Sequence, residues 1–250
     1  MRYFICLGYD GTGYSGWQIQ PGALSVQETL EKSLSLFLRH ETCVVGAGRT
    51  DAGVHASRMV AHFDSDSPLD TEWVKNKLNS ILPPDISVWN VVRVRDNAHA
   101  RFDAVSRTYR YHVTMERTPF GRDYCWILHK APDFDLMNEA SSILLDTVDF
   151  TSFSKLHTDT RTNDCHVTEA FWAPDGRNGM AYTITANRFL RNMVRAVVGT
   201  LMEVGRHRIT VSDFAGIVAS RDRCSAGDSA PARGLFLDSI AYPDDIFNVD

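Results

Sequence analysis

The first element predicted in the chain is a short strand and the second an amphipathic helix, and this alternation constrains the fold most. Residues 2–9 have the pattern of a strand. In the next segment, "SVQETLEKSLSLFLRH", Ser25 and Glu28 have the spacing of a helix capping box. Apolar residues at helical spacing predict one buried face, formed by Val26, Leu30, Leu34, Phe37 and Leu38. Such a helix packs on a sheet, so the predicted class is α+β.

Strand and helix signals continue to alternate along the rest of the chain. Strands are predicted near 43–46, 57–63, 86–94, 106–114, 164–173, 180–186 and 235–242. Helices are predicted near 71–82, 134–146, 188–203 and 211–220, the first of them ended by Pro83 and Pro84. The chain contains no short repeat, low-complexity segment or flexible linker. We therefore expect two similar α+β halves, residues 1–105 and 106–250, with a cleft between them.

The charge balance limits the partners. The chain has 26 Lys and Arg against 31 Asp and Glu, a formal net charge of −5. This argues against a general polyanion binder, because cations that neutralise phosphates supply nonspecific affinity for nucleic acid. Arginines nevertheless cluster in two stretches, which contain Arg101, Arg107 and Arg110, and Arg188, Arg191, Arg195, Arg206 and Arg208. The pattern is compatible with a basic cleft on an acidic protein.

Membrane, secreted and zinc-binding classes find no support in the sequence. No apolar run approaches the ~18 residues of a membrane span. The start, "MRYFICLGYD", lacks the basic region, apolar stretch and cleavage site of a secretory signal, so a cytoplasmic protein is expected. The five cysteines are odd in number and include no C-x-x-C pair, which favours neither a disulfide framework nor a zinc knuckle.

Residues 44–56, "VVGAGRTDAGVHA", form a glycine-rich stretch that differs from the common nucleotide-binding motifs. Val54 and His55 stand where a phosphate loop needs Lys followed by Ser or Thr. The third glycine of a dinucleotide fingerprint is also missing. A metal site made of Asp51, His55 and His62 is a weaker alternative, because no ligand spacing supports it.

What remains is a tight loop whose glycines allow a sharp turn and the close approach of a large substrate. Arg49 and Asp51 project from it, and an arginine two residues away favours the charged form of the aspartate. Local sequence leaves two interpretations open. The pair either ties down the loop or carries out catalysis.

Several blocks of the chain resemble, in the same order, tRNA pseudouridine synthases of the TruA type. These blocks are "YDGTGYSGWQIQP", "SVQETLE", "GAGRTDAGVHA", "LNSILPPDI", "HARFDAVSRTYRY", "FLRNMVRAVVGTLMEVG" and "APARGLFL", and together they extend over nearly the whole chain. The resemblance implies the pseudouridine synthase fold, with two related halves that are each a mainly antiparallel sheet flanked by helices. It also implies an active-site cleft between the halves and a homodimer.

The same resemblance assigns roles to individual residues. It makes Asp51 the catalytic aspartate, Tyr109 the aromatic side chain that packs against the target uracil, and Arg195 the cation paired with Asp51. Arg49 would help to displace the target nucleotide from its stack. Leu235 would line the pocket.

The residue patterns around Tyr109 and Arg195 are consistent with these roles. In "SRTYRY", Arg107, Tyr109, Arg110 and Tyr111 predict phosphate-pairing and base-stacking groups that alternate between the faces of one strand, although a lone tyrosine is more often a core residue. In "RFLRNMVRAVVGTL", helical geometry predicts an apolar side opposite a cationic one, formed by Arg188, Arg191 and Arg195. That cationic side is either solvated or holds an RNA backbone, so Arg107, Arg110, Arg188 and Arg191 are candidate RNA-binding residues.

The implied reaction breaks the uridine N-glycosidic bond, turns the uracil and rejoins it to the ribose through C5. No metal or other cofactor is required. The implied substrates are uridines 38 to 40 in the anticodon stem-loop of tRNA. Asp51 could attack C6, attack C1′ or remove a proton from C2′, and the sequence does not choose among these routes. A noncatalytic RNA-binding module and a metal-dependent hydrolase are the alternative hypotheses.

Overall fold

The computed structural model describes residues 1–155, 162–176 and 179–248. The chain divides into two compact units, of which the first comprises Met1–Ser106 and Phe236–Asp250 and the second Arg107–Leu235. The C-terminal segment therefore belongs with the first unit and not with the predicted half 106–250. The reason is that the last strand pairs with a strand of the first unit, and a turn after it, Asp244–Phe247, contacts another.

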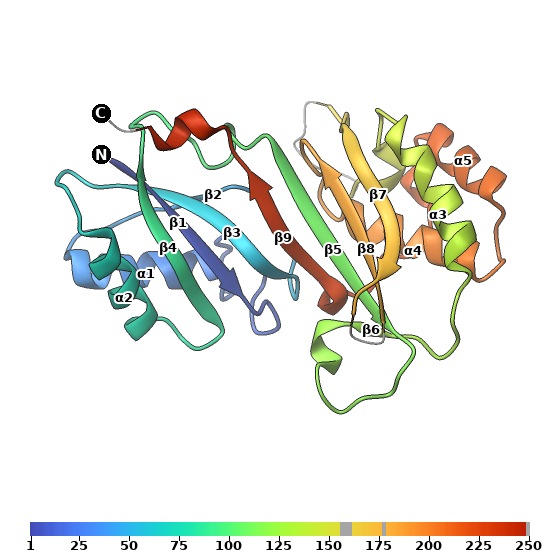
Figure 1. Ribbon diagram of the computed structural model, residues 1–250, viewed down its shortest axis with the longest axis horizontal. Helices are drawn as coiled ribbons and strands as arrows, with labels where there is room; N and C mark the ends of the chain where they lie inside the picture. The colour runs from blue at the N-terminus through green and yellow to red at the C-terminus, as the bar shows by residue number, and fades with distance from the viewer. Residues whose placement is uncertain (156–161, 177–178, 249–250) are drawn as a thin grey trace. The chain divides into compact units, whose positions relative to one another are not determined.

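The first unit is a sheet with two helices (Figure 1). Its strands are β1 (Arg2–Tyr9), β2 (Val45–Gly46), β3 (His55–Asp64), β4 (Ile86–Val94) and β9 (Leu235–Ala241), and its helices are α1 (Val26–Leu38) and α2 (Thr71–Ile81). Strand β1 lies between β4 and β3 and is antiparallel to both. Strand β9 joins the other side of β3 in parallel register, with His55 opposite Phe236.

Helix α1 begins where the sequence predicts, but its capping is simpler. The Ser25 hydroxyl accepts a hydrogen bond from the Glu28 backbone N–H at 3.2 Å, which satisfies one of the free donors at the helix start. The Glu28 carboxylate pairs with Lys32 one turn later, so the reciprocal half of the predicted capping box is not formed. Val26, Leu30 and Leu34 are buried as predicted, whereas Phe37 and Leu38 are half-buried near the end of the helix.

The second unit also combines a sheet with helices (Figure 1). Its strands are β5 (Ser106–Thr114), β6 (Trp126–Ile127), β7 (Val167–Pro174) and β8 (Gly179–Ala186), and its helices are α3 (Phe134–Ser142), α4 (Met193–Gly205) and α5 (Val211–Ser220). Strand β8 is antiparallel to both β5 and β7, and short β6 runs parallel to β5. Helix α3 packs against β7, α4 and α5.

Helix α4 differs from the predicted helix at 188–203, because it begins only at Met193. Asn192 has a φ of 65°, in the left-handed region, and a right-handed helix cannot run through that residue. The predicted arginine-rich helix face is therefore wrong, since Arg188 and Arg191 precede the helix. Within α4 only Arg195 and Glu203 escape full burial, as expected of a helix that is apolar all round.

The remaining boundaries follow familiar helix signals. Helix α2 ends before Pro83 and Pro84, as predicted. Helix α3 ends at Ser142 and continues as a 3-10 turn over Ile143–Leu145, within the predicted range. In the described part of the chain, no helix is long and apolar enough to cross a membrane. The protein is thus of the mixed α/β type, which confirms the predicted class in its coarser form.

Candidate active site

The loop that carries Asp51 is held in place by the segment that follows β1. The Tyr9 hydroxyl lies 2.8 Å from the Thr50 hydroxyl, and both side chains are buried. The Trp17 backbone N–H donates to the Thr50 carbonyl at 3.2 Å, and the Gly53 N–H donates to the Tyr14 carbonyl at 3.3 Å. These contacts anchor the backbone of Thr50, which lies between Arg49 and Asp51. The Arg49 side chain is exposed and the Asp51 side chain is half-buried.

Two glycines allow this close contact between the segments. Gly16 has a φ of +94°, and a Cβ there would lie 2.3 Å from the Thr50 carbonyl oxygen. A Cβ at Gly11 would lie 2.0 Å from the carbonyl oxygen of Val54. Neither position tolerates a side chain without movement of the Asp51 loop. By contrast, a Cβ at Gly48 would meet no atom within 4 Å, so this glycine of the motif is not required by packing.

His55 contributes to the support of the loop. It is 1% exposed, and its Nδ1 accepts a hydrogen bond from the Gly11 N–H at 3.1 Å. The same nitrogen lies 3.1 Å from Asp10 Oδ1, and the ring stacks on Phe236 with centroids 4.6 Å apart. These contacts give His55 a structural role in joining the segment after β1 to the start of β3.

The weaker metal hypothesis required His55 and His62 to share an ion with Asp51. The two histidines are seven residues apart on one extended strand, a separation of roughly 23 Å at ~3.3 Å per residue. His62 Nδ1 accepts from the Ala100 N–H at 3.1 Å, and burial lowers the pKa of this histidine to about 4, with Arg2 and His99 adding to the effect. Across the described residues, no group of three or more His, Cys, Asp or Glu side chains could hold a metal ion.

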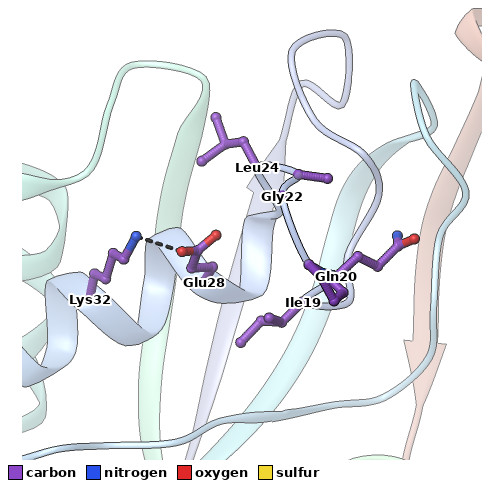
Figure 2. A pocket seen from close by; sticks show the side chains of 8 residues that line it. Ile19, Gln20, Gly22, Leu24, Glu28 and Lys32 are labelled. Carbon is purple, nitrogen blue, oxygen red and sulfur yellow. Dashed lines mark hydrogen bonds and ion pairs between the residues drawn. The ribbon is translucent and has the colours of Figure 1, made fainter.

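A shallow pocket lies beside α1, apart from the Asp51 loop. It has a volume of about 550 Å³ and is lined by residues 19–24 together with Glu28 and Lys32. Figure 2 shows the ion pair between these two charged side chains, with the Ile19 and Leu24 side chains also lining the pocket. None of the predicted site residues lines it.

The predicted site residues are divided between the two units. Arg49 and Asp51 belong to the first unit. The second unit holds Tyr109, Arg195, Leu235, Arg107, Arg110, Arg188 and Arg191.

Tyr109 lies on β5 opposite Ile184 of β8 and is 8% exposed. Its ring packs edge-on against Phe189, with centroids 5.0 Å apart and an interplanar angle of 81°. The Arg107 guanidinium donates to the Asn187 carbonyl at 2.8 Å. The structure thus brings Tyr109 and Arg107 to the segment that follows β8 and carries Arg188.

The predicted alternation along β5 is partly wrong. Side chains two residues apart lie on the same face of a strand. Arg107 therefore shares a face with Tyr109 and Tyr111, and only Arg110 lies on the other face. Both tyrosines are buried, so this strand presents no row of exposed rings.

Arg195 is held by a segment that crosses α4. Its Nε donates to the Ala230 carbonyl at 2.7 Å, and the Ala230 N–H donates to the Arg195 carbonyl at 2.9 Å. Gly199, one turn later, permits the crossing, because a Cβ there would lie 1.7 Å from the Asp228 carbonyl oxygen. The backbone of this crossing segment therefore fixes the direction of the Arg195 side chain.

The other predicted residues lie around this framework. Leu235 is buried at the start of β9, next to Gly234, where a Cβ would lie 2.7 Å from the Tyr111 ring. Arg191 is exposed, and its carbonyl accepts from the Lys155 N–H at 3.1 Å. Residues 156–161 lie outside the described residues.

Sequence reasoning missed the supporting residues. Phe189, Tyr9 and Trp17 lie within blocks that resemble the family. The resemblance therefore included these residues, but it did not show that they support the site. Ala230 also begins one of these blocks, but its residue type did not show its role, because it acts through its backbone.

Comparison with known proteins shows the family to which the chain belongs. The model of a tRNA pseudouridine synthase family matches residues 5–103 and 140–243. The chain therefore belongs to the tRNA pseudouridine synthase family, a class of isomerases.

Curated relatives agree along the whole length of the chain. It is 57% identical over 249 residues to tRNA pseudouridine synthase A of Bacteroides thetaiotaomicron, covering 99% of this chain and 93% of the relative. It is 56% identical to the protein of the same name in Bacteroides fragilis, covering 98% of each chain. It is 38% identical to the one in Clostridium acetobutylicum, covering 95% of this chain and 98% of the relative.

Proposed function

We propose that this protein converts uridine to pseudouridine at positions 38 to 40 in the anticodon stem-loop of tRNA, with Asp51 as the catalytic residue and without a cofactor. Family membership and the names of the relatives support isomerisation of uridine in tRNA. The position within the tRNA and the roles of individual residues rest on the resemblance of the motifs.

The observation that carries the proposal is the support of the Asp51 loop. Thr50 is anchored by Tyr9 and Trp17, so the following carboxylate is half-buried on a fixed backbone. Attack on C6, attack on C1′ and proton removal from C2′ all need a carboxylate positioned against the target nucleotide. Positioning of this kind lowers a reaction barrier without any change in the chemistry of the group.

The other residues take roles around that carboxylate. Arg195 pairs with Asp51, Arg49 helps to displace the target nucleotide, and Leu235 lines the pocket. Extruding the target costs a few kcal/mol, and stacking on an aromatic ring such as Tyr109 returns about 1–3 kcal/mol. Because Tyr109 is already packed against Phe189, its ring is held ready for this contact.

We further propose a cytoplasmic homodimer of chains built from two related halves, with the active-site cleft between the halves. Phosphate contacts come from Arg107, Arg110, Arg188 and Arg191. Two clefts joined by dimerisation give a protein of net charge −5 a locally basic surface, so binding of tRNA weakens steeply as salt rises.

Mapping of pseudouridine tests the proposal. Unmodified tRNA is incubated with the protein, labelled with carbodiimide and read by reverse transcription. We expect new stops at positions 38 to 40, also in the presence of a chelator. Binding without any pseudouridine would show a noncatalytic RNA-binding module, and activity abolished by the chelator would favour a metal-dependent enzyme.

A further inference from the structure

Two irregularities flank the same residue of β1 in the first unit. On the β4 side, Leu7 pairs with Val88 and Cys6 with Asn90, so Trp89 is an extra residue that bulges from the ladder. On the β3 side, Leu7 pairs with Met59 and Tyr9 with Ala56, which leaves Ser57 and Arg58 together opposite Gly8. Bulges of this type redirect side chains and are frequent next to active sites.

The first bulge lays the Trp89 ring across the sheet. Its Nε1 donates to the Ser57 carbonyl of β3 at 3.3 Å, although β1 lies between β4 and β3. Neighbouring strands are ~4.8 Å apart, so the indole has to extend over β1 to reach that carbonyl. A Cβ at Gly8 would lie 3.1 Å from two atoms of the ring. The indole therefore rests on a backbone without a side chain, and Trp89 is 58% exposed.

The second bulge places a cation on the residue after Ser57, whose carbonyl binds the indole. Arg58 is exposed, and its guanidinium makes no hydrogen bond or ion pair with any residue that the structure describes. Three polar side chains, Ser57, Ser87 and Asn90, lie in the same part of the sheet. Trp89 and Arg58 thus form a surface that combines one exposed aromatic ring with one positive charge, and polar side chains lie beside them.

This surface is connected to the Asp51 loop through a short path. Gly8, beneath the indole, is followed by Tyr9, whose hydroxyl lies 2.8 Å from that of Thr50. Thr50 directly precedes Asp51. The ring and the cation therefore lie at the end of the sheet from which the loop emerges.

We propose that Trp89 and Arg58 form a binding site for an unpaired nucleotide of the RNA substrate, with its base stacked on the indole and its phosphate paired with the guanidinium. The inference rests on the proposed function and adds a substrate contact to it. Exposed aromatic rings bind bases of any sequence by stacking, and arginine pairs with phosphate. A second protein chain would instead need a broad apolar patch, which the polar surroundings of Trp89 do not provide.

Binding of an unmodified tRNA transcript tests the site directly. Trp89→Ala is expected to weaken binding roughly 5- to 100-fold, whereas Trp89→Phe retains a stacking face and stays within about threefold of the parent. Arg58→Gln is expected to lower the slope of log affinity against log salt by up to about 1. The matched control is Trp73→Ala, which removes a tryptophan of similar exposure from α2, where the ring packs on Phe37.

The readouts separate this inference from the proposed function. The rate of pseudouridine formation at saturating tRNA is expected to stay within about threefold in Trp89→Ala, because the site binds substrate without touching the reacting atoms. Equal affinity of Trp89→Ala and parent would overturn the inference, as would a loss of affinity that appears only with dissociation of a dimer. A parent that binds tRNA without forming pseudouridine would overturn the proposed function and leave the binding comparison intact.

Discussion

Asp51, the candidate catalytic residue, and Arg195, its proposed partner, are held in contrasting ways. Around Asp51 the hydrogen bonds are made by its neighbours in the loop, Thr50 before it and Gly53 after it, so the backbone is fixed on both sides of the residue. Around Arg195 the side chain itself is gripped, because its Nε donates to Ala230. Asp51, as the proposed reacting residue, has to direct its carboxylate at the substrate. Arg195, as its proposed partner, has to hold its side chain in one direction.

Both arrangements depend on a glycine that lets a distant segment approach. Gly16 admits the carbonyl of Thr50, and Gly199 admits the carbonyl of Asp228. In each unit, therefore, the position of the candidate residue depends on a close backbone contact that a glycine permits. Substitutions that separate side-chain chemistry from backbone support test this comparison.

Arg195 gives the largest expected effect among these substitutions. Arg195→Ala is expected to lower pseudouridine formation about 1,000-fold, equivalent to about 4 kcal/mol of transition-state stabilisation, with tRNA affinity changed less than tenfold. Arg195→Lys keeps the charge but loses the planar donor to Ala230, so its activity should be intermediate. Single-turnover rates measure this. Glu203→Gln, on the same face of α4, is the control, and normal turnover in Arg195→Ala would contradict the assigned role.

Gly16 tests the support of the loop. Gly16→Ala adds a Cβ 2.3 Å from the Thr50 carbonyl at a residue with φ +94°. We expect a loss of about 3 kcal/mol in the free energy of unfolding, measured by urea denaturation, because the loop has to shift. Gly48→Ala is the matched control in the same motif, since its Cβ meets no atom within 4 Å. Equal stability of the two variants would show that the packing at Gly16 does not hold the loop.

Tyr109 separates ring packing from hydroxyl chemistry in the second unit. Tyr109→Phe keeps the ring against Phe189 and is expected to lose little activity. Tyr109→Leu removes the stacking face, and activity should fall about 100-fold, or about 2.7 kcal/mol. Equal and severe loss in both variants would assign a role to the hydroxyl, and full activity in both would remove Tyr109 from the site.

Acid is expected to weaken the first unit through His62. Burial lowers the pKa of this histidine to about 4 in the folded protein, below the ordinary value of 6.5, so the unfolded chain binds a proton more readily. The stability from the neutral ring is present above pH 6.5 and is lost as the pH falls towards 4. We expect a loss of about 2 kcal/mol over that window, measured by urea denaturation at several pH values. His62→Gln should flatten this dependence, and exposed His40→Gln should not.

The sequence predicted the elements whose signals are local. Ser25 marks the start of α1 and Pro83 follows the end of α2, because caps and prolines act within a few residues. Helical spacing alone placed Arg188 and Arg191 on α4, and it failed there because nothing in the pattern shows the left-handed conformation of Asn192. The glycine-rich loop was recognisable as a turn, but the glycines that let another segment pack against it, Gly11 and Gly16, lie more than 30 residues away in the chain from the residues they meet.

The contacts that fix Arg195 were beyond sequence reasoning for the same physical reason. Ala230 and Asp228 act through backbone atoms, which every residue type supplies. A backbone contact between distant segments leaves no residue signature except the glycine that makes room for it. Here that glycine is Gly199. It lies inside an apolar helix pattern, where a glycine lowers the stability of the helix.

The central claim is that Asp51 is the reacting group and that the loop around it serves only to present it. Asp51→Asn keeps the size and the backbone of the residue and removes the carboxylate. Measured with unmodified tRNA under single-turnover conditions, the variant is expected to form pseudouridine at least about 10,000-fold more slowly than the parent, with tRNA affinity within about tenfold. Pseudouridine formation at a rate near that of the parent would contradict the claim.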